Sequence, residues 1–358
     1  MAALGLTGPN RAFWSGKRVL LTGHTGFKGA WTAIWLSRMG ALVSGLALEP
    51  AESPNLFHLT RISHLIDHHI IDLRDFTTVR ASLFQREFDI VLHMAAQAFV
   101  RASIKDPVST IATNVMGTSH LLEALRDHSE LQAILVVTSD KVYANAEDGT
   151  TFKEEDPLGG KDPYSASKAA TEIVTTSFAK TFFDKAGIPL ATARGGNVIG
   201  GGDYSRDRLM SDILRASMAG EAPILRHPEA TRPWQHVLDC VAGYLVLTER
   251  LTTIADVPRA VNFGPRPDAP AMTVGELASR AVAGLGARPW RHEPDGTSIE
   301  ARTLGIDTEL ARNALGFSSL LDAAAAVDWT VEWHLSYANG ASARDLCEEQ
   351  ISRYEELR

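Results

Sequence analysis

The feature that most constrains the fold is a set of three glycines, Gly23, Gly26 and Gly29, which follows a short apolar run at 18–22. Glycine permits a tight turn from a strand into a helix, and it leaves room for a pyrophosphate beside the backbone N–H groups at the positive end of that helix. Glycine turns also end strands for steric reasons alone, so the spacing is informative because it lies between a strand and a helix. We predict a dinucleotide-binding turn, with cofactor contacts from Gly23, Thr25, Gly26, Phe27, Lys28 and Gly29.

Further short apolar runs alternate with longer amphipathic stretches. Strands are predicted at 42–48, 90–93 and 133–138, and the first helix is expected to end near Gly40. Strands that alternate with helices are typical of βαβ units, in which right-handed crossovers place helices on both faces of a parallel sheet. The expected fold class is therefore α/β, a doubly wound parallel sheet with a smaller C-terminal lobe.

Loop-forming residues divide the second half of the chain. Proline and glycine become frequent after Arg194, at 195–203, 226–234 and 263–271, where we expect a substrate-binding lobe to begin. A chain of 358 residues, 45% of them hydrophobic, can bury one large core together with a smaller one. The predicted dinucleotide-binding domain is 1–195 plus about 237–263, and the predicted lobe is about 196–236 and 264–358.

Two acidic residues are candidates for the adenosine end of the cofactor. The ribose is often met by an acidic residue about twenty positions after the glycines. Glu49 is the nearest candidate, although Pro50 follows it and a solvated loop carboxylate is the alternative. An acidic residue here favours NAD over NADP. Asp72, beside Leu73, is expected to accept from the adenine amino group; its alternative role is to cap the following helix.

A phenol and an ammonium four residues apart form the catalytic candidate. Tyr164 and Lys168 lie on one face of a predicted helix. Free tyrosine has a pKa of about 10, and a neighbouring cation favours the phenolate that can act as a base. The pair could instead be an ordinary exposed helix pair. Ser139, at the end of the strand some 25 residues earlier, offers a hydroxyl to the same substrate oxygen, because ligands bind at the carboxyl ends of parallel strands.

Six segments together resemble the extended short-chain dehydrogenase/reductase family, over nearly the whole chain. They are TGHTGFKG (22–29), HMAAQ (93–97), NVMGT (114–118), TSDK (138–141), YSASK (164–168) and RGGNVIGGGD (194–203). Within that family, FWSGKRVLLTGHTGFKGAW (13–31), RPWQHV (232–237) and NFGPR (262–266) are most similar to the branch of 4,6-dehydratases that act on CDP-glucose.

The resemblance implies a Rossmann fold, bound NAD and a set of site residues. Ser139, Tyr164 and Lys168 would be the catalytic triad, and the glycines would form the pyrophosphate turn. Further cofactor contacts are expected from Ala95, Ala96, Gln97, Asn114, Tyr164 and Lys168. Relatives often pair through the helices after Asn114 and around Tyr164, so a homodimer or a higher homo-oligomer is expected.

The reaction we expect is loss of water from a nucleotide-linked glucose. In this hypothesis Tyr164 takes the proton of the 4-hydroxyl while hydride passes from C4 to NAD, and Ser139 holds the oxygen. Asp140 is assigned as the acid for the leaving water and Lys141 as the base at C5. Related enzymes acting on dTDP-glucose carry an Asp-Glu pair at these two positions. A surface ion pair is the alternative for Asp140 and Lys141.

The substrate's diphosphate requires cations. Arg208 and Arg232 are the best candidates, because a guanidinium binds phosphate oxygens in a bidentate fork. Asn197 is expected to donate to the same group. Gln97 is assigned to the sugar and Trp234 to the substrate pocket, although packing alone could explain Trp234. The preference for CDP-glucose depends on the resemblance only.

Bulk properties exclude several other functions. The formal net charge of −8 gives no field that attracts nucleic acid or an anionic membrane. Two cysteines, Cys240 and Cys347, lack metal-ligand spacing and are expected to be core thiols; no metal site is expected. We find neither a signal peptide nor a membrane span, which predicts a cytoplasmic protein. The open alternatives are a 4-epimerase, a dTDP- or GDP-sugar dehydratase, and a non-catalytic dinucleotide-binding protein.

Overall fold

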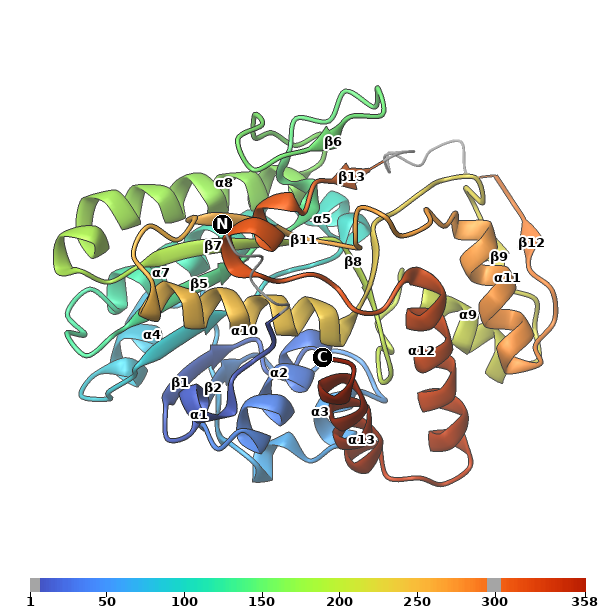
Figure 1. The fold of residues 1–358 in the computed structure, drawn as a ribbon, viewed down its shortest axis with the longest axis horizontal. Coiled ribbons are helices and arrows are strands. Elements are labelled where there is room, and N and C mark those ends of the chain that lie inside the picture. Colours follow the sequence, from blue (N-terminus) through green and yellow to red (C-terminus); the bar gives the residue numbers. More distant parts are fainter. Residues whose placement is uncertain (1–6, 295–303) are drawn as a thin grey trace.

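One parallel sheet organises the protein (Figure 1). The computed structural model describes residues 7–294 and 304–358; residues 1–6 and 295–303, which fall in the predicted domain and lobe, lie outside the described residues. The seven strands follow the order β11-β7-β5-β4-β1-β2-β3 and all pair in parallel. Their bounds are β1 Arg18–Thr22, β2 Leu42–Ala47, β3 Asp67–Ile70, β4 Ile90–His93, β5 Ala133–Val137, β7 Leu190–Gly195 and β11 Ala260–Phe263. The predicted fold class is confirmed, and β2 and β5 each end one residue earlier than predicted.

Alternate residues of each strand pack against helices on opposite faces. Val19 and Leu21 of β1 belong to a core cluster shared with α2 (Phe27–Arg38) and α10 (Val237–Thr253). Leu20 points the other way, into a cluster shared with α4 (Phe76–Leu83) and α7 (Gly117–Ala124). Helix α8 (Pro163–Phe178) packs beside α7. Burial on both faces explains why these strands read as continuous apolar runs.

Shorter helices connect the main elements. The α-helices are α1 Arg11–Trp14, α3 Leu56–Leu59, α5 Val100–Lys105 and α6 Pro107–Ile111. The 3₁₀ segments are η1 Ile62–His64, η3 Asp140–Val142 and η5 Asp184–Ala186, and the π segments are η2 Ala112–Met116, η4 Ala179–Phe183 and η6 Ala311–Leu315.

A separate apolar cluster lies beyond the sheet. It joins α9 (Leu209–Met218), α11 (Val274–Leu285) and α12 (Ala323–Ala338), which stand together on the right of Figure 1. Two short parallel pairs accompany it: β8 (Asn197–Ile199) with β10 (Trp234–His236), and β9 (Ile224–Leu225) with β12 (Arg291–His292). A third pair, β6 (Thr151–Phe152) with β13 (Gly305–Ile306), belongs to another small cluster, which includes Val142 and Tyr143 after β5 and Ala169 on α8.

The C-terminal helix packs with the sheet domain. In α13 (Ala343–Glu356), Ile351 and Tyr354 share the core cluster of Trp35 on α2, and the Trp35 indole N–H donates to Glu355 at 2.9 Å. The sequence prediction assigns this helix to the lobe. The exact division into domain and lobe therefore stays a prediction, while α10 and β11 carry the chain back to the sheet between the lobe segments.

Strand order determines where a ligand can bind. The chain runs from β1 towards β3 on one side and from β4 towards β11 on the other, so the direction reverses between β1 and β4. Ligands of open α/β sheets bind in the crevice at such a reversal, outside the carboxyl ends of the strands. The glycine turn follows β1, residues 94–97 follow β4 and residues 138–141 follow β5, so the predicted site segments meet at one edge.

Within the described residues, no helix combines the length and the apolar character needed to cross a membrane. Across the same residues, no group of three or more histidine, cysteine, aspartate or glutamate side chains could hold a metal ion. Both cysteines are free and buried, as expected.

Candidate active site

Helix α8 carries the predicted catalytic pair on a buried face. The helix starts at a capping box in which Asp162 accepts from the backbone of Ser165, with Pro163 in the first turn. This start fixes Tyr164 in the first turn, where it is 8% exposed, and Lys168 one turn later at 5%. The two side chains are therefore buried and do not form an exposed surface pair.

Tyr164 meets Ser139 across the end of β5. Burial raises the pKa of Tyr164, and a hydrogen bond with the Ser139 hydroxyl opposes that shift. Lys168 Nζ donates to the carbonyl oxygen of Val137, the last residue of β5, at 3.1 Å. The helix and the strand end thus bring the three triad candidates together.

The ammonium of Lys168 lies among few compensating groups. Burial, together with the like charge of Lys28, lowers its pKa to about 7, while the charge of Glu172 opposes that shift. A pKa in this range lets the side chain gain or lose a proton near neutrality. That property suits a group that assists proton transfer from a sugar hydroxyl.

Asp140 is a buried carboxyl, and one of its two oxygens accepts no hydrogen bond. It is 2% exposed; Ser139 Oγ donates to Oδ1 at 2.9 Å, and Oδ2 has no hydrogen-bond partner. Burial raises the pKa of Asp140, while Lys141, Arg232 and Lys28 oppose the shift by their charges. The shift is towards the neutral acid, the form that a proton donor needs, and the side chain is not part of a surface pair.

The glycine turn has the geometry that a dinucleotide needs. Gly23 adopts a φ of +77°, and a Cβ there would lie 2.7 Å from the backbone nitrogen of Ala95. A Cβ on Gly29 would lie 2.1 Å from the Gly23 carbonyl oxygen. Helix α2 starts at Phe27, and Gly26 supplies no side-chain cap, so the first N–H groups remain for an anion. The residues present therefore fit a bound pyrophosphate.

Replacing Gly29 with alanine is expected to weaken dinucleotide binding by ten-fold or more, since the added methyl would push the turn apart. Titration of NAD by calorimetry, with the unfolding temperature recorded in parallel, checks this. Gly187→Ala provides the control for a glycine loss alone, because a Cβ on Gly187 would face open space. Equal NAD affinity in both variants would contradict the assigned role of the turn.

The adenosine candidates lie near the ends of β2 and β3. Glu49 is exposed, two residues past β2, and Thr25 Oγ1 donates to the Leu48 carbonyl at 2.8 Å, which holds the glycine turn against this segment. Arg74 engages both carboxylate oxygens of Asp72, and this ion pair lowers the pKa of Asp72. The suggested capping role of Asp72 is wrong, because Asp75 is the N-cap of α4. Leu73 is buried.

The segment after β4 is held by its own polar groups. Asn114 Oδ1 accepts from the backbone N–H of Gln97 at 2.8 Å, and its amide donates to Ser167 on α8 at 2.8 Å. The Gln97 amide donates to Phe99 and Thr110. Asn114 and Gln97 therefore order the loop that carries Ala95 and Ala96, and any contact with cofactor or sugar comes in addition to these bonds.

Two arginines from the predicted lobe act electrostatically on predicted catalytic residues. Arg208, the N-cap of α9, donates to the carbonyl of Ala98 at 3.2 Å. Burial raises the pKa of Tyr164, and the positive charge of Arg208 opposes that rise. Arg232 donates to the Thr231 carbonyl at 2.8 Å and acts electrostatically on Asp140. Both cations are thus near the mouth of the triad, where a diphosphate would need them.

The remaining two substrate candidates lie on paired short strands. Asn197 on β8 is half-buried and in register with Trp234 on β10. Trp234 is 4% exposed, packs in the lobe core and donates to the Met272 carbonyl at 3.0 Å. The structure places Trp234 as a support of the lobe, and nothing in it tests a substrate contact.

A buried network behind the triad is absent from the sequence predictions. Glu172 and Arg194 form an ion pair at 2.8 Å, with side chains 2% and 4% exposed. Glu172 continues the four-residue spacing of Tyr164 and Lys168 in YSASKAATE, so the spacing could have indicated it. Tyr244, on α10, lies under Lys28, whose Nζ is 5.7 Å from the centre of its ring.

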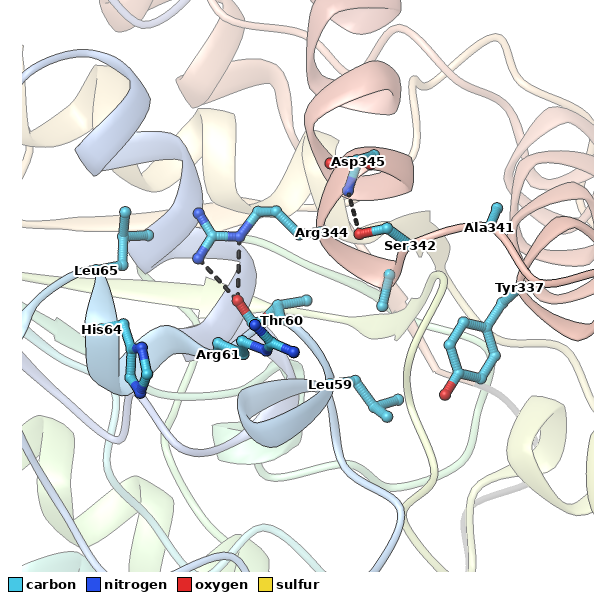
Figure 2. Close-up of a pocket in the computed structure, with 11 residues that line it drawn as sticks. Leu59, Thr60, Arg61, His64, Leu65, Tyr337, Ala341, Ser342, Arg344 and Asp345 are labelled. Carbon is cyan, nitrogen blue, oxygen red and sulfur yellow. Dashed lines mark hydrogen bonds between the residues drawn. The ribbon is translucent and has the colours of Figure 1, made fainter.

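One pocket among the described residues lies away from this site. It encloses about 570 Å³ between α3 and the turn that joins α12 to α13. Figure 2 shows Arg344 there, donating to the Thr60 carbonyl, with Tyr337 on the far side. None of the predicted catalytic residues lines it. The candidate active site is therefore defined by the buried polar groups at the strand ends.

Comparisons with known proteins place the chain in a family. Residues 20–261 match the family described as GDP-mannose 4,6 dehydratase. A CDP-glucose 4,6-dehydratase of Salmonella typhimurium is 41% identical over 96% of this chain and 98% of its own length. A dTDP-glucose 4,6-dehydratase of Streptomyces niveus is 28% identical over 88% and 92%.

Solved structures agree on the fold. The dTDP-glucose 4,6-dehydratase of Bacillus anthracis, in complex with NAD, superimposes with a TM-score of 0.74 at 20% identity and covers 92% of this chain and all of its own. The epimerase Mth375 of Methanothermobacter thermautotrophicus has a TM-score of 0.77 at 20% identity, with 92% and 95% covered. By sequence, over most of its length, the chain belongs to the GDP-mannose 4,6 dehydratase family of extended short-chain dehydrogenases/reductases.

Proposed function

We propose that this protein is an NAD-dependent CDP-glucose 4,6-dehydratase, which converts CDP-D-glucose to CDP-4-keto-6-deoxy-D-glucose and water. The observation that carries the proposal is Asp140, a buried carboxyl with a free oxygen and a raised pKa beside Ser139. An epimerase needs no acid at O6, whereas a dehydratase does. The relative that acts on CDP-glucose, at 41% identity, supports the choice of base.

Each proton transfer of the proposed reaction is assigned to a side chain of the site. Tyr164 takes the proton of the 4-hydroxyl, Ser139 holds the oxygen, and the positive charge of Lys168 stabilises the phenolate. Held at the glycine turn, NAD would supply a hydride acceptor for C4 and a hydride donor for C6. The 4-ketone acidifies the proton at C5, which Lys141 removes, and Asp140 protonates O6 so that it leaves as water. A proton returned to C5 completes the balance.

The substrate lies between the sheet and the lobe in this proposal. Arg208 and Arg232 bind the diphosphate, and Asn197 donates a hydrogen bond to it. Gln97 contacts the sugar. The adenosine of NAD occupies the ends of β2 and β3, near Glu49 and Asp72. A cytoplasmic location belongs to the same proposal and is supported by two free, buried thiols.

An assay of the purified protein with CDP-, dTDP-, GDP- and UDP-hexoses and NAD tests the function. A product lighter than CDP-glucose by one water, which gives the alkali-generated chromophore of a 4-keto-6-deoxy sugar, is expected with CDP-glucose. A product of unchanged mass and inverted stereochemistry would point to the epimerase. Absence of turnover with every sugar nucleotide would favour the non-catalytic binding protein.

We also propose a homodimer, on the basis of apolar side chains that α5, α6 and α8 leave exposed. Val108 on α6 is 76% exposed and Ile173 on α8 is 61% exposed, and the two helices are in contact. Ile104, Ile111 and Met116 add to the exposed apolar surface of α5, α6 and η2. Large exposed apolar patches mark interaction sites, and a second copy of this chain is the occupant we propose.

The pair Val108→Asp and Ile173→Asp is expected to convert dimers to monomers, because two carboxylates per subunit would be buried without partners. Light scattering gives the mass. Met218→Asp serves as the control, since Met218 is 80% exposed on α9 in the lobe. Dimers that persist in the double variant would rule out this face.

A further inference from the structure

Glu172 joins the catalytic helix to the end of β5. It is 2% exposed and lies one turn after Lys168 on the face of α8 that carries Tyr164. Its Oε1 accepts from the hydroxyl of Thr138, the residue between β5 and Ser139, at 2.5 Å. Lys168, on the preceding turn, donates to Val137. Two successive turns of the helix are therefore bonded to two successive residues leading to Ser139.

The other carboxylate oxygen is anchored separately. Oε2 accepts from Arg194 at 2.8 Å and from Thr192 at 2.7 Å, both on β7. Burial lowers the pKa of Arg194, but the hydrogen bond to Glu172 raises it, and the net shift is upward. The guanidinium therefore stays charged. The second terminal nitrogen of Arg194, Nη1, donates to the Tyr143 hydroxyl at 2.9 Å. Paired and hydrogen-bonded on both oxygens, Glu172 is held in one position, as a buried charge requires.

We propose that Glu172 is a positioning residue of the active site, which holds the face of α8 bearing Tyr164 and Lys168 against the strand end bearing Ser139 and supplies the anion that faces Lys168. The proposal rests on the catalytic roles proposed above for those three residues. Glu172 itself touches neither substrate nor cofactor; it acts through Thr138 and Lys168.

The charged and titratable groups around Lys168 come from three elements. Lys28 on α2 has the same charge, while His93 on β4 is neutral, since burial and the nearby ammonium lower its pKa to about 3. Tyr164 and Glu172 lie one turn away on α8 itself. Of these groups, Glu172 is the one that favours the charged form of Lys168. Removing its negative charge must therefore lower the pH at which Lys168 loses its proton.

The first test measures that ionisation without turnover. NMR of protein labelled with ¹³C-lysine follows Lys168 against pH, and its signal is assigned by its loss in Lys168→Met. In Glu172→Gln, which keeps the size and an acceptor for Thr138, the midpoint is expected to fall by about one pH unit. Thr192→Val, which removes a hydrogen bond to the same carboxylate but no charge, should leave it unchanged. An unchanged midpoint in Glu172→Gln overturns the proposal.

The second test measures geometry by kinetics with CDP-glucose. Thr138→Val is expected to lower kcat about ten-fold with little change in KM, and Thr138→Ser should recover most of it, because a displaced triad slows the chemical step. Thr192→Val is the matched control: an equally buried threonine bonded to the same carboxylate from β7. Equal kcat in Thr138→Val and Thr192→Val overturns the positioning role.

The two tests separate this proposal from the proposed function. If the wild-type protein turns over no sugar nucleotide, the function fails, and the lysine titration still decides whether Glu172 governs Lys168. If Glu172→Gln does not fold, as its unfolding transition would show, Thr138→Val keeps the Glu172–Arg194 ion pair intact and decides the positioning role by kcat.

Discussion

Replacing Tyr164 with phenylalanine is expected to lower the turnover of CDP-glucose by about 10³-fold, because the substituted protein lacks the base that takes the proton of the 4-hydroxyl. The hydroxyl is the only group removed, and the ring keeps its buried place on α8. NAD affinity should change by no more than a few-fold. Rapid mixing with CDP-glucose, followed by absorbance of the reduced cofactor, measures whether the hydride step itself is lost.

A second buried phenol controls for the loss of a tyrosine hydroxyl. Tyr354 on α13 donates to Asp239 at 2.6 Å, in the core behind α2. Tyr354→Phe should cost about 1–3 kcal/mol in the free energy of unfolding, since the buried Asp239 loses a partner, and leave kcat nearly unchanged below the unfolding transition. If Tyr164→Phe and Tyr354→Phe had the same kcat, Tyr164 would not be the base.

Local spacing was sufficient for the parts of the site that lie within one element or turn. The glycine turn could be predicted because Gly23 and Gly29 answer steric demands of a strand that passes directly into a helix, as the close approach of Gly29 to the Gly23 carbonyl shows. Tyr164 and Lys168 could be predicted because a spacing of four places two side chains on one helix face. Both inferences depend on neighbours in sequence.

What sequence could not supply depends on which elements pack together. Whether Glu172 and Arg194 are surface groups or a buried pair depends on the pairing of β5 with β7 and on α8 lying over them. Asp72 was a plausible helix cap on sequence, but in the structure Asp75 caps α4 by accepting from the backbone N–H of Thr78. The return of α13 to α2 depends on contacts more than 300 residues apart, such as that of Trp35 with Glu355.

Burial moves the pKa values of Asp140 and Lys168 in opposite directions. It makes Asp140 harder to ionise and Lys168 easier to neutralise, so both are displaced towards their uncharged forms. An acid and a cation with pKa values moved towards each other are typical of sites that transfer protons near neutral pH. The low dielectric of the buried site also strengthens hydrogen bonds made to the substrate oxygen.

Asp140→Asn and Lys141→Ala are expected to separate oxidation from dehydration. The amide introduced by Asp140→Asn would keep the volume and the acceptor for Ser139 Oγ, yet it has no acidic proton to give to O6, so water loss should fall by about 10²–10³-fold while C4 oxidation changes only a few-fold. Lys141→Ala removes the proposed C5 base with the same separation. Reduced cofactor should accumulate in both variants, and mass spectrometry of the quenched reaction should show a 4-keto hexose that retains its 6-hydroxyl. Equal loss of oxidation and dehydration in both variants would instead assign Asp140 and Lys141 to the support of the triad, and the acid at O6 would have to be sought among the other groups near Ser139.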